Sequence, residues 1–244
     1  MKRSVKLALD IVMGSVVPIL ILNNLNESLG TVNTYVVAAL VPVAWVFVDL
    51  FFITKQFNFI TSYIGISGLI RGLIAFWFVD GVQFAFKDNA GSIFTVVVFG
   101  GSIIIHKPIM RYFVTQALNP NSSKQKRLLK ALLAESKVYW SLVKGTRLVL
   151  MINLLTGIIN FFLNLQIVVA EFGTSAFNQQ VAQVNAITRI ALAIPEFAGF
   201  WIAVMLIRRA ISYYLPEEEY EEQDDSDFWD LLQLRETQKT TAES

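Results

Sequence analysis

The sequence contains no cysteine and only one histidine, His106, among its 244 residues. Disulfides, thiolate metal sites and cysteine nucleophiles are therefore excluded, and one imidazole is too few for a multi-histidine metal site. The sequence also lacks the G-x-S-x-G, H-E-x-x-H and Walker-type patterns of hydrolases, metalloproteases and nucleotide-driven motors. We therefore expect no enzymatic activity and no cofactor. His106 leaves two interpretations open, a helix cap or an axial ligand to a haem or chlorophyll.

Charged residues are scarce and unevenly distributed. Residues 1–216 hold 18 basic and 8 acidic side chains, whereas residues 217–244 hold 2 and 11. The net charge of +1 therefore hides a basic body and an acidic tail. Because 55% of the residues are hydrophobic, we expect a membrane domain over residues 1–215 and a disordered acidic cytoplasmic tail over residues 216–244.

Long apolar runs are the most abundant feature of the chain. A helix needs roughly 17–20 mostly apolar residues to cross the hydrocarbon core of a bilayer. Six runs approach or exceed this length, at residues 7–22, 31–53, 57–79, 90–106, 146–170 and 184–207. They predict an all-α integral membrane protein, a bundle of six transmembrane helices.

Basic residues mark alternate connections between these runs and so predict the orientation. The connections expected on the outer side carry a single basic residue, Lys87; they are residues 23–30, 80–89 and 171–183. Because an excess of Lys and Arg marks the cytoplasmic side, we expect both termini in the cytoplasm. The expected location is a bacterial inner membrane or another energy-transducing membrane.

A basic segment at residues 119–145 separates the fourth and fifth runs. Four leucines recur in it at helical spacing, with Lys or Arg around them: Leu128, Leu129, Leu132 and Leu133. The pattern predicts a cytoplasmic amphipathic helix. This helix either lies at the lipid interface, attracted by anionic headgroups, or packs on the underside of the bundle.

Two groups of polar residues lie inside the predicted spans. The first shares one face of the fifth span and predicts a helix-packing stripe, formed by Asn153, Gly157, Asn160 and Asn164. The second is an expected intramembrane charge cluster of Arg71, Arg189 and Glu196. Because an isolated charge at depth is costly, these three side chains should find partners in the bundle interior. The cluster is either a site for an ion, a proton or an anionic substrate, or a structural ion pair.

The acidic tail contains an apolar patch, formed by Phe228, Trp229, Leu231 and Leu232. Such a patch on a polar tether is suited to fold as a short helix on a groove of a protein. Its partner is either the chain's own basic segment, residues 124–147, or a separate basic protein. The alternative is a solvated tail without a partner.

A resemblance to a known family adds to this interpretation. Residues 89–114 contain a glycine- and serine-bearing apolar span that ends in Lys107-Pro108-Ile109-Met110, and the first run contains Val17-Pro18-Ile19. Over residues 5–212 the chain resembles a bacterial multi-pass inner-membrane family grouped with intracellular septation protein A. The resemblance implies no established catalytic activity and a link to envelope or septum maintenance.

Two functions follow from these observations. The first is a non-enzymatic envelope or assembly factor that contacts membrane lipids and membrane-protein partners, and no nucleic acid, through its basic helix and tail. The second is a transporter or channel for a small solute or ion that uses the charge cluster.

The topology is testable with reporter fusions. Because of the charge asymmetry, reporters after Ser244 and within residues 121–123 should be cytoplasmic, and reporters within residues 26–28 and 175–180 should be external. Paired phosphatase and fluorescent-protein fusions measure both outcomes. An external signal from the fusion after Ser244 would contradict the six-span arrangement.

Overall fold

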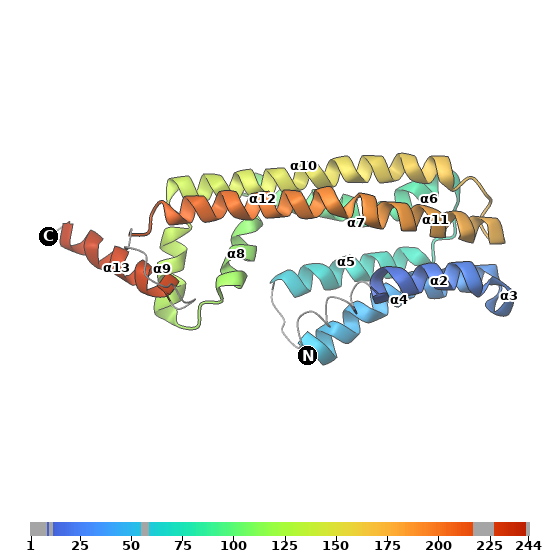
Figure 1. Ribbon diagram of the computed structural model, residues 1–244, viewed down its shortest axis with the longest axis horizontal. Coiled ribbons are helices and arrows are strands. Elements are labelled where there is room, and N and C mark those ends of the chain that lie inside the picture. Colours follow the sequence, from blue (N-terminus) through green and yellow to red (C-terminus); the bar gives the residue numbers. More distant parts are fainter. Residues whose placement is uncertain (1–8, 10–11, 55–58, 217–226, 243–244) are drawn as a thin grey trace. The chain divides into compact units, whose positions relative to one another are not determined.

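The computed structural model describes residues 9, 12–54, 59–216 and 227–242, and this part of the chain is helical without any strand (Figure 1). The expected all-α class is therefore confirmed. The elements up to the third apolar run are η1 (Val12–Val16), α2 (Val17–Asn24), α3 (Asn26–Leu29), α4 (Thr31–Val48), η2 (Asp49–Thr54) and α5 (Phe59–Ala75). They are followed by α6 (Gly81–Asp88), α7 (Ala90–Ile104), α8 (Met110–Leu118), α9 (Ser123–Leu132), α10 (Ser136–Ile167), α11 (Ser175–Ala191), α12 (Ala193–Ser212) and α13 (Asp227–Ala242).

Three helical stretches are long and apolar enough to cross a membrane. They are Thr31–Ile53, Ser136–Ile167 and Ser175–Ser212. Two shorter apolar helices, Gly65–Ala75 and Ala90–Ile104, fall within the third and fourth predicted runs. The helices are thus compatible with a membrane protein, while the count of six spans stays a prediction.

The chain forms two compact units. The first unit comprises Met1–Val98 and Met151–Phe197, and the second comprises Phe99–Leu150 and Ala198–Ser244. The boundaries fall within α7, α10 and α12. Helix α13 belongs to the second unit, and the expected division into a membrane domain and a tail stays a prediction.

The first unit is organised around an aromatic cluster. The rings of Phe84 and Phe177 lie 5.1 Å apart in an edge-to-face arrangement, and both side chains are buried. Tyr35 and Phe172 contact the same cluster, with ring centroids 5.6 Å apart. Such pairs add to the free energy gained by burying the rings. The cluster joins α4, α6 and α11 with the loop before α11.

The second unit packs the basic amphipathic helix by its apolar face. Helix α9 begins with a capping box in which the Ser122 side chain accepts from the Gln125 backbone N–H and the Gln125 side chain accepts from the Ser122 backbone N–H. All four of the leucines singled out in the sequence are at most 3% exposed: Leu128, Leu129, Leu132 and Leu133. The structure therefore favours packing within the protein over insertion of this face into lipid.

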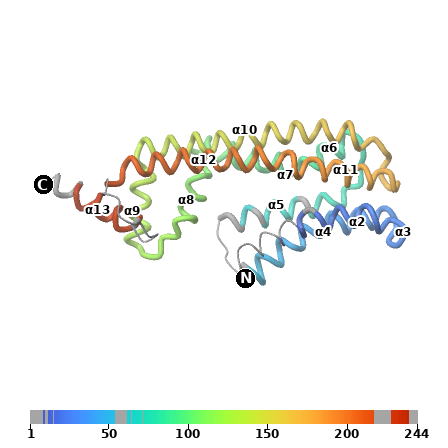
Figure 2. Tube along the Cα trace, viewed as in Figure 1, coloured from blue at the N-terminus to red at the C-terminus, as the bar shows by residue number. Residues whose placement is uncertain are grey.

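Helix α13 corrects the expectation of a disordered tail for residues 227–242. It packs against α9, as Figure 2 shows. Leu232 is 1% exposed, Arg235 forms an ion pair with Glu135, and Lys124 Nζ donates to Gln233 Oε1 at 2.7 Å. Phe228, Trp229 and Leu231 are half-buried on the same helix. The chain's own basic segment is thus the surface that the apolar patch contacts. The acidic stretch 217–226 lies outside the described residues.

The docking of α13 depends on the burial of Leu232. Replacing a buried leucine by alanine costs about 2–5 kcal/mol, so Leu232→Ala should release α13 and increase its amide hydrogen exchange at least about tenfold. Leu234→Ala is the matched control, because Leu234 is 43% exposed on the same helix. Equal exchange in the two variants, measured by mass spectrometry, would contradict the packing.

Candidate functional site

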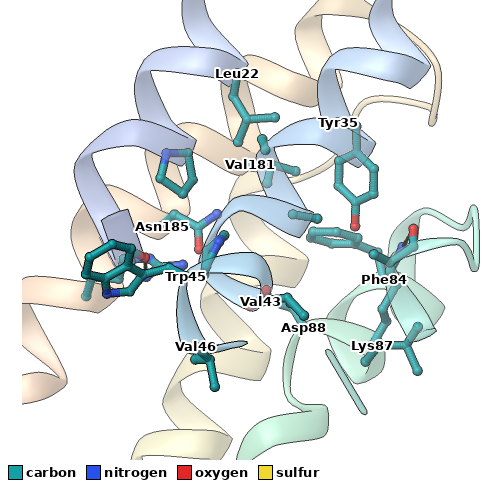
Figure 3. A pocket seen from close by; sticks show the side chains of 18 of the residues that line it. Leu22, Tyr35, Val43, Trp45, Val46, Phe84, Lys87, Asp88, Val181 and Asn185 are labelled. Atoms are coloured by element: carbon teal, nitrogen blue, oxygen red, sulfur yellow. Dashed lines mark hydrogen bonds between the residues drawn. The ribbon is translucent and has the colours of Figure 1, made fainter. Parts of the chain in front are cut away.

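The first unit contains a cavity of about 450 Å³. Figure 3 shows side chains from α2, α4, α6 and α11 around it. Two of the walls are helical stripes with a spacing of four residues, formed by Gly14, Pro18 and Leu22 and by Val181, Asn185 and Arg189. A third wall follows α4 and η2 from Tyr35 to Asp49, which corresponds to about 21 Å of helix. The cavity therefore extends over most of the length of one predicted span.

Most of the lining is apolar, and six polar side chains interrupt it. Apolar lining residues include Leu22, Ala38, Val43 and Phe84. The polar side chains are Tyr35, Asp49, Lys87, Asp88, Asn185 and Arg189. An apolar cavity with a few polar groups is the usual form of a small-molecule site.

Lys87 is the most constrained of these polar residues. Its side chain is only 5% exposed, and Nζ donates to the carbonyl of Ala75 at 3.3 Å and to that of Trp77. The ammonium group also lies 4.6 Å from the centre of the Tyr35 ring, a cation–π contact. Burial lowers the pKa of Lys87 to about 8, although the charge of Asp88 acts in the opposite direction. This amine can therefore change charge close to neutral pH.

Asp88 is held by the polar stripe of α10. Its Oδ2 atom accepts from Asn160 Nδ2 and from Asn164 Nδ2, each at 2.9 Å. Asn160 Nδ2 also lies 3.2 Å from Asn89 Oδ1. Hydrogen bonds from neutral amides solvate the carboxylate without neutralising it. The negative charge is thereby fixed beside Lys87.

The rest of the stripe lies along the same helix. Gly157 brings α10 close to α7, because a Cβ atom at this position would lie 3.1 Å from Ser92 Cβ. Asn153 is half-buried, and its carbonyl accepts from Thr156 Oγ1 at 3.2 Å. Asn160 Oδ1 and Asn164 Oδ1 are buried without a hydrogen-bond partner among the described residues. The stripe thus combines close helix packing with binding of a carboxylate, a role that the sequence pattern did not predict.

The structure describes two side chains of the expected charge cluster, Arg189 and Glu196, and they do not pair with each other. Arg189 lines the cavity and donates to the carbonyl of Gly14, whereas Glu196 accepts from Thr156 Oγ1 at 2.8 Å. No ion pair joins these two in the described part of the chain. The helix is interrupted at Leu192, between α11 and α12, and Pro195 cannot donate to the carbonyl of Ala191. Arg71 lies on α5, and its side chain is outside what the structure describes.

His106 lies outside this site, in the second unit. It is exposed, lies two residues after the end of α7 and has a φ of 55°. Its backbone N–H donates to the carbonyl of Ile103 at 3.0 Å. This is the position of a residue that ends a helix in the left-handed conformation.

Sequence reasoning missed Lys87 and Asp88 as site residues. The available signal was Lys87 itself, the one basic residue in the three connections expected on the outer side. Asp49 and Asn185 carried no such signal, because neither stands in a recognisable motif.

The chain matches no protein-family model, and neither the curated proteins nor the solved structures include a significant match. The resemblance to the septation protein group therefore stays a prediction.

The titration of Lys87 predicts a pH-dependent stability. Its pKa is about 8 in the folded protein, against an ordinary value of 10.5. The folded protein therefore binds fewer protons than the unfolded chain between these values, and its free energy of unfolding should rise with pH from about 8 to 10.5. Melting temperatures in detergent should show this rise in the wild type relative to Lys87→Met. Parallel pH profiles of the two proteins would contradict the buried amine.

Proposed function

We propose that the protein is a multi-pass membrane protein that binds a small charged solute in the cavity of the first unit and moves it across the membrane. The observation that carries this proposal is the composition of the cavity wall. The lining contains Asp49 and Tyr35 toward opposite ends of the long α4–η2 stretch, and the pair Lys87 and Asp88 on α6. The ionisable groups are therefore distributed along the length of a span.

The predicted topology gives these positions a direction. With six spans and both termini in the cytoplasm, Asp49 belongs to the cytoplasmic half of its span. Lys87 and Asp88 belong to a connection on the outer side. A solute that enters at the outer side would meet the lysine and carboxylate first and leave past Asp49. Charged side chains within spans are expensive and typically line the path of a substrate or an ion.

The lining also indicates the class of solute. It combines two cations, Lys87 and Arg189, with two carboxylates, Asp49 and Asp88. Because apolar walls strengthen electrostatic interactions, a molecule that carries both signs of charge would bind such a lining best. The volume of about 450 Å³ falls within the usual range of small-molecule sites. A zwitterionic or dipolar metabolite is the solute that fits this description.

The alternative of an assembly factor is less well supported. That function was expected to use the apolar patch of the tail to contact a partner protein. Leu232 is buried against the same unit, and Arg235 is paired with Glu135. The tail helix would have to leave α9 before it could offer this surface to a partner.

The absence of cysteine makes the cavity directly testable. Ala39 lines the cavity, whereas Ala44 does not line it and lies on an exposed face of the same helix, which would face lipid in the predicted span. A single Ala39→Cys variant should react with a small, membrane-impermeant thiol reagent at least about tenfold faster than Ala44→Cys, because only a hydrated thiol ionises readily.

The same two variants also test which solutes bind in the cavity. Zwitterionic metabolites should protect Ala39→Cys from labelling, and a protecting compound should cross liposomes that contain the wild-type protein faster than protein-free liposomes. Labelling of Ala39→Cys as slow as that of Ala44→Cys would show that the cavity is closed to water and would contradict the proposal. An accessible cavity without any flux would support binding without transport.

A further inference from the structure

The second unit contains a separate cavity of about 350 Å³ whose charged lining is entirely basic. Four cationic side chains surround it, Lys107, Arg111, Lys126 and Lys130. No acidic residue contributes to the lining. The hydroxyl-bearing residues Tyr112 and Thr115 complete the polar part, and Leu129 and Leu133 are its buried apolar residues.

The local fold brings these four cations together from α9 and from the segment around the start of α8. Lys107 lies three residues before α8, Arg111 is in the first turn of α8, and Lys126 and Lys130 are four residues apart on α9. Asn119 ends α8 in the left-handed conformation, with a φ of 43°, and Pro120 follows it. The chain then reverses, and the capping box at Ser122 begins α9. The two basic pairs therefore line the same cavity although they are separated in the sequence.

The four cations have no acidic partner among the described residues of the second unit. An ion pair in the described part of this unit joins Arg235 to Glu135, and neither residue lines the cavity. The charged side chains of the lining therefore all carry the same sign. Like charges that share a concave surface repel one another, and the concavity concentrates their field. A bound anion would relieve this repulsion.

We propose that this cavity binds a phosphate-bearing anion, either the headgroup of an anionic lipid or a soluble phosphate ester. The arginine offers two parallel N–H donors that match two phosphate oxygens, and the lysines supply point charges around them. Leu129 and Leu133 border the cavity, where they can contact the apolar part of a ligand. The site lies in a different unit from the solute cavity and does not depend on the proposed transport.

This proposal differs from a general attraction of a basic helix to a membrane. The apolar face of α9 is buried in the protein and is not available to insert into lipid. Arg127 and Lys144 are equally basic and exposed, yet they do not line the cavity. Position in the cavity, and not the number of charges in the segment, should therefore decide binding.

The test uses the full-length protein in detergent and measures bound ligand by native mass spectrometry. The pocket variant is Arg111→Gln/Lys130→Gln, and the matched control is Arg127→Gln/Lys144→Gln, which removes the same charge from the same unit. The lipid probes are phosphatidylglycerol and phosphatidylcholine, and the soluble probe is glycerol 3-phosphate. Arg111→Lys/Lys130→Arg, which keeps all four charges, shows whether binding survives substitution at these positions.

We expect wild-type protein and the control to retain phosphatidylglycerol, and the pocket variant to bind it about 30-fold more weakly, from about fivefold for each basic residue. The charge-conserving variant should bind nearly as well as the wild type. Binding of phosphatidylglycerol but not glycerol 3-phosphate assigns the site to a lipid headgroup, and the reverse assigns it to a soluble phosphate ester. Equal losses in the pocket and control variants, or no binding of either phosphate by the wild type, would overturn the proposal.

Discussion

The carboxylate of Asp88 receives hydrogen bonds from Asn160 and Asn164, and the first unit depends on this interaction. It ties the short helix α6 to the long helix α10. Because α6 is fixed in this way, the neighbouring Lys87 is turned inward, where backbone carbonyls and the Tyr35 ring surround its ammonium group. A buried charge needs such partners to replace water. The positions of Lys87 and Asp88 in the cavity lining therefore follow from how one carboxylate is solvated.

The second unit follows a different constraint, the burial of leucine. Helix α9 has too many basic residues to be buried as a whole, so it packs by its leucines alone and leaves its cations exposed. Helix α13 packs against the same helix, where Lys124 donates to Gln233, and Arg235 forms an ion pair with Glu135 just after the end of α9. Two of the cations of α9, Lys126 and Lys130, line the basic cavity together with Arg111 of α8. Hydrophobic packing thus determines where the positive charge collects.

The two cavities have different electrostatic characters, and this supports separate ligands for them. The cavity of the first unit is mostly apolar and contains both signs of charge. The cavity of the second unit contains four cations and no acid. A mixed lining suits a dipolar solute, and a cationic lining suits a phosphate group. Each ligand class follows from its own set of residues.

Local patterns in the sequence predicted the helical class and the amphipathic helix at α9, because these depend on residue type and on a spacing of three to four residues. They left open whether the leucines of α9 face lipid or pack within the protein. The sequence also placed Asn160 and Asn164 on one helical face. It did not predict Asp88 as their partner, because the two segments are 72 and 76 residues apart.

The charge cluster shows the limit of the same reasoning. Helical spacing placed Arg189 and Glu196 on one face, yet each found a different partner across the interruption at Leu192. Apart from α13, the sequence by itself determined which segments are helical and which faces are apolar, since neighbouring residues decide both. Only the tertiary structure decided which polar groups meet, because a buried charge binds whichever donor or acceptor the packing of distant helices brings within reach.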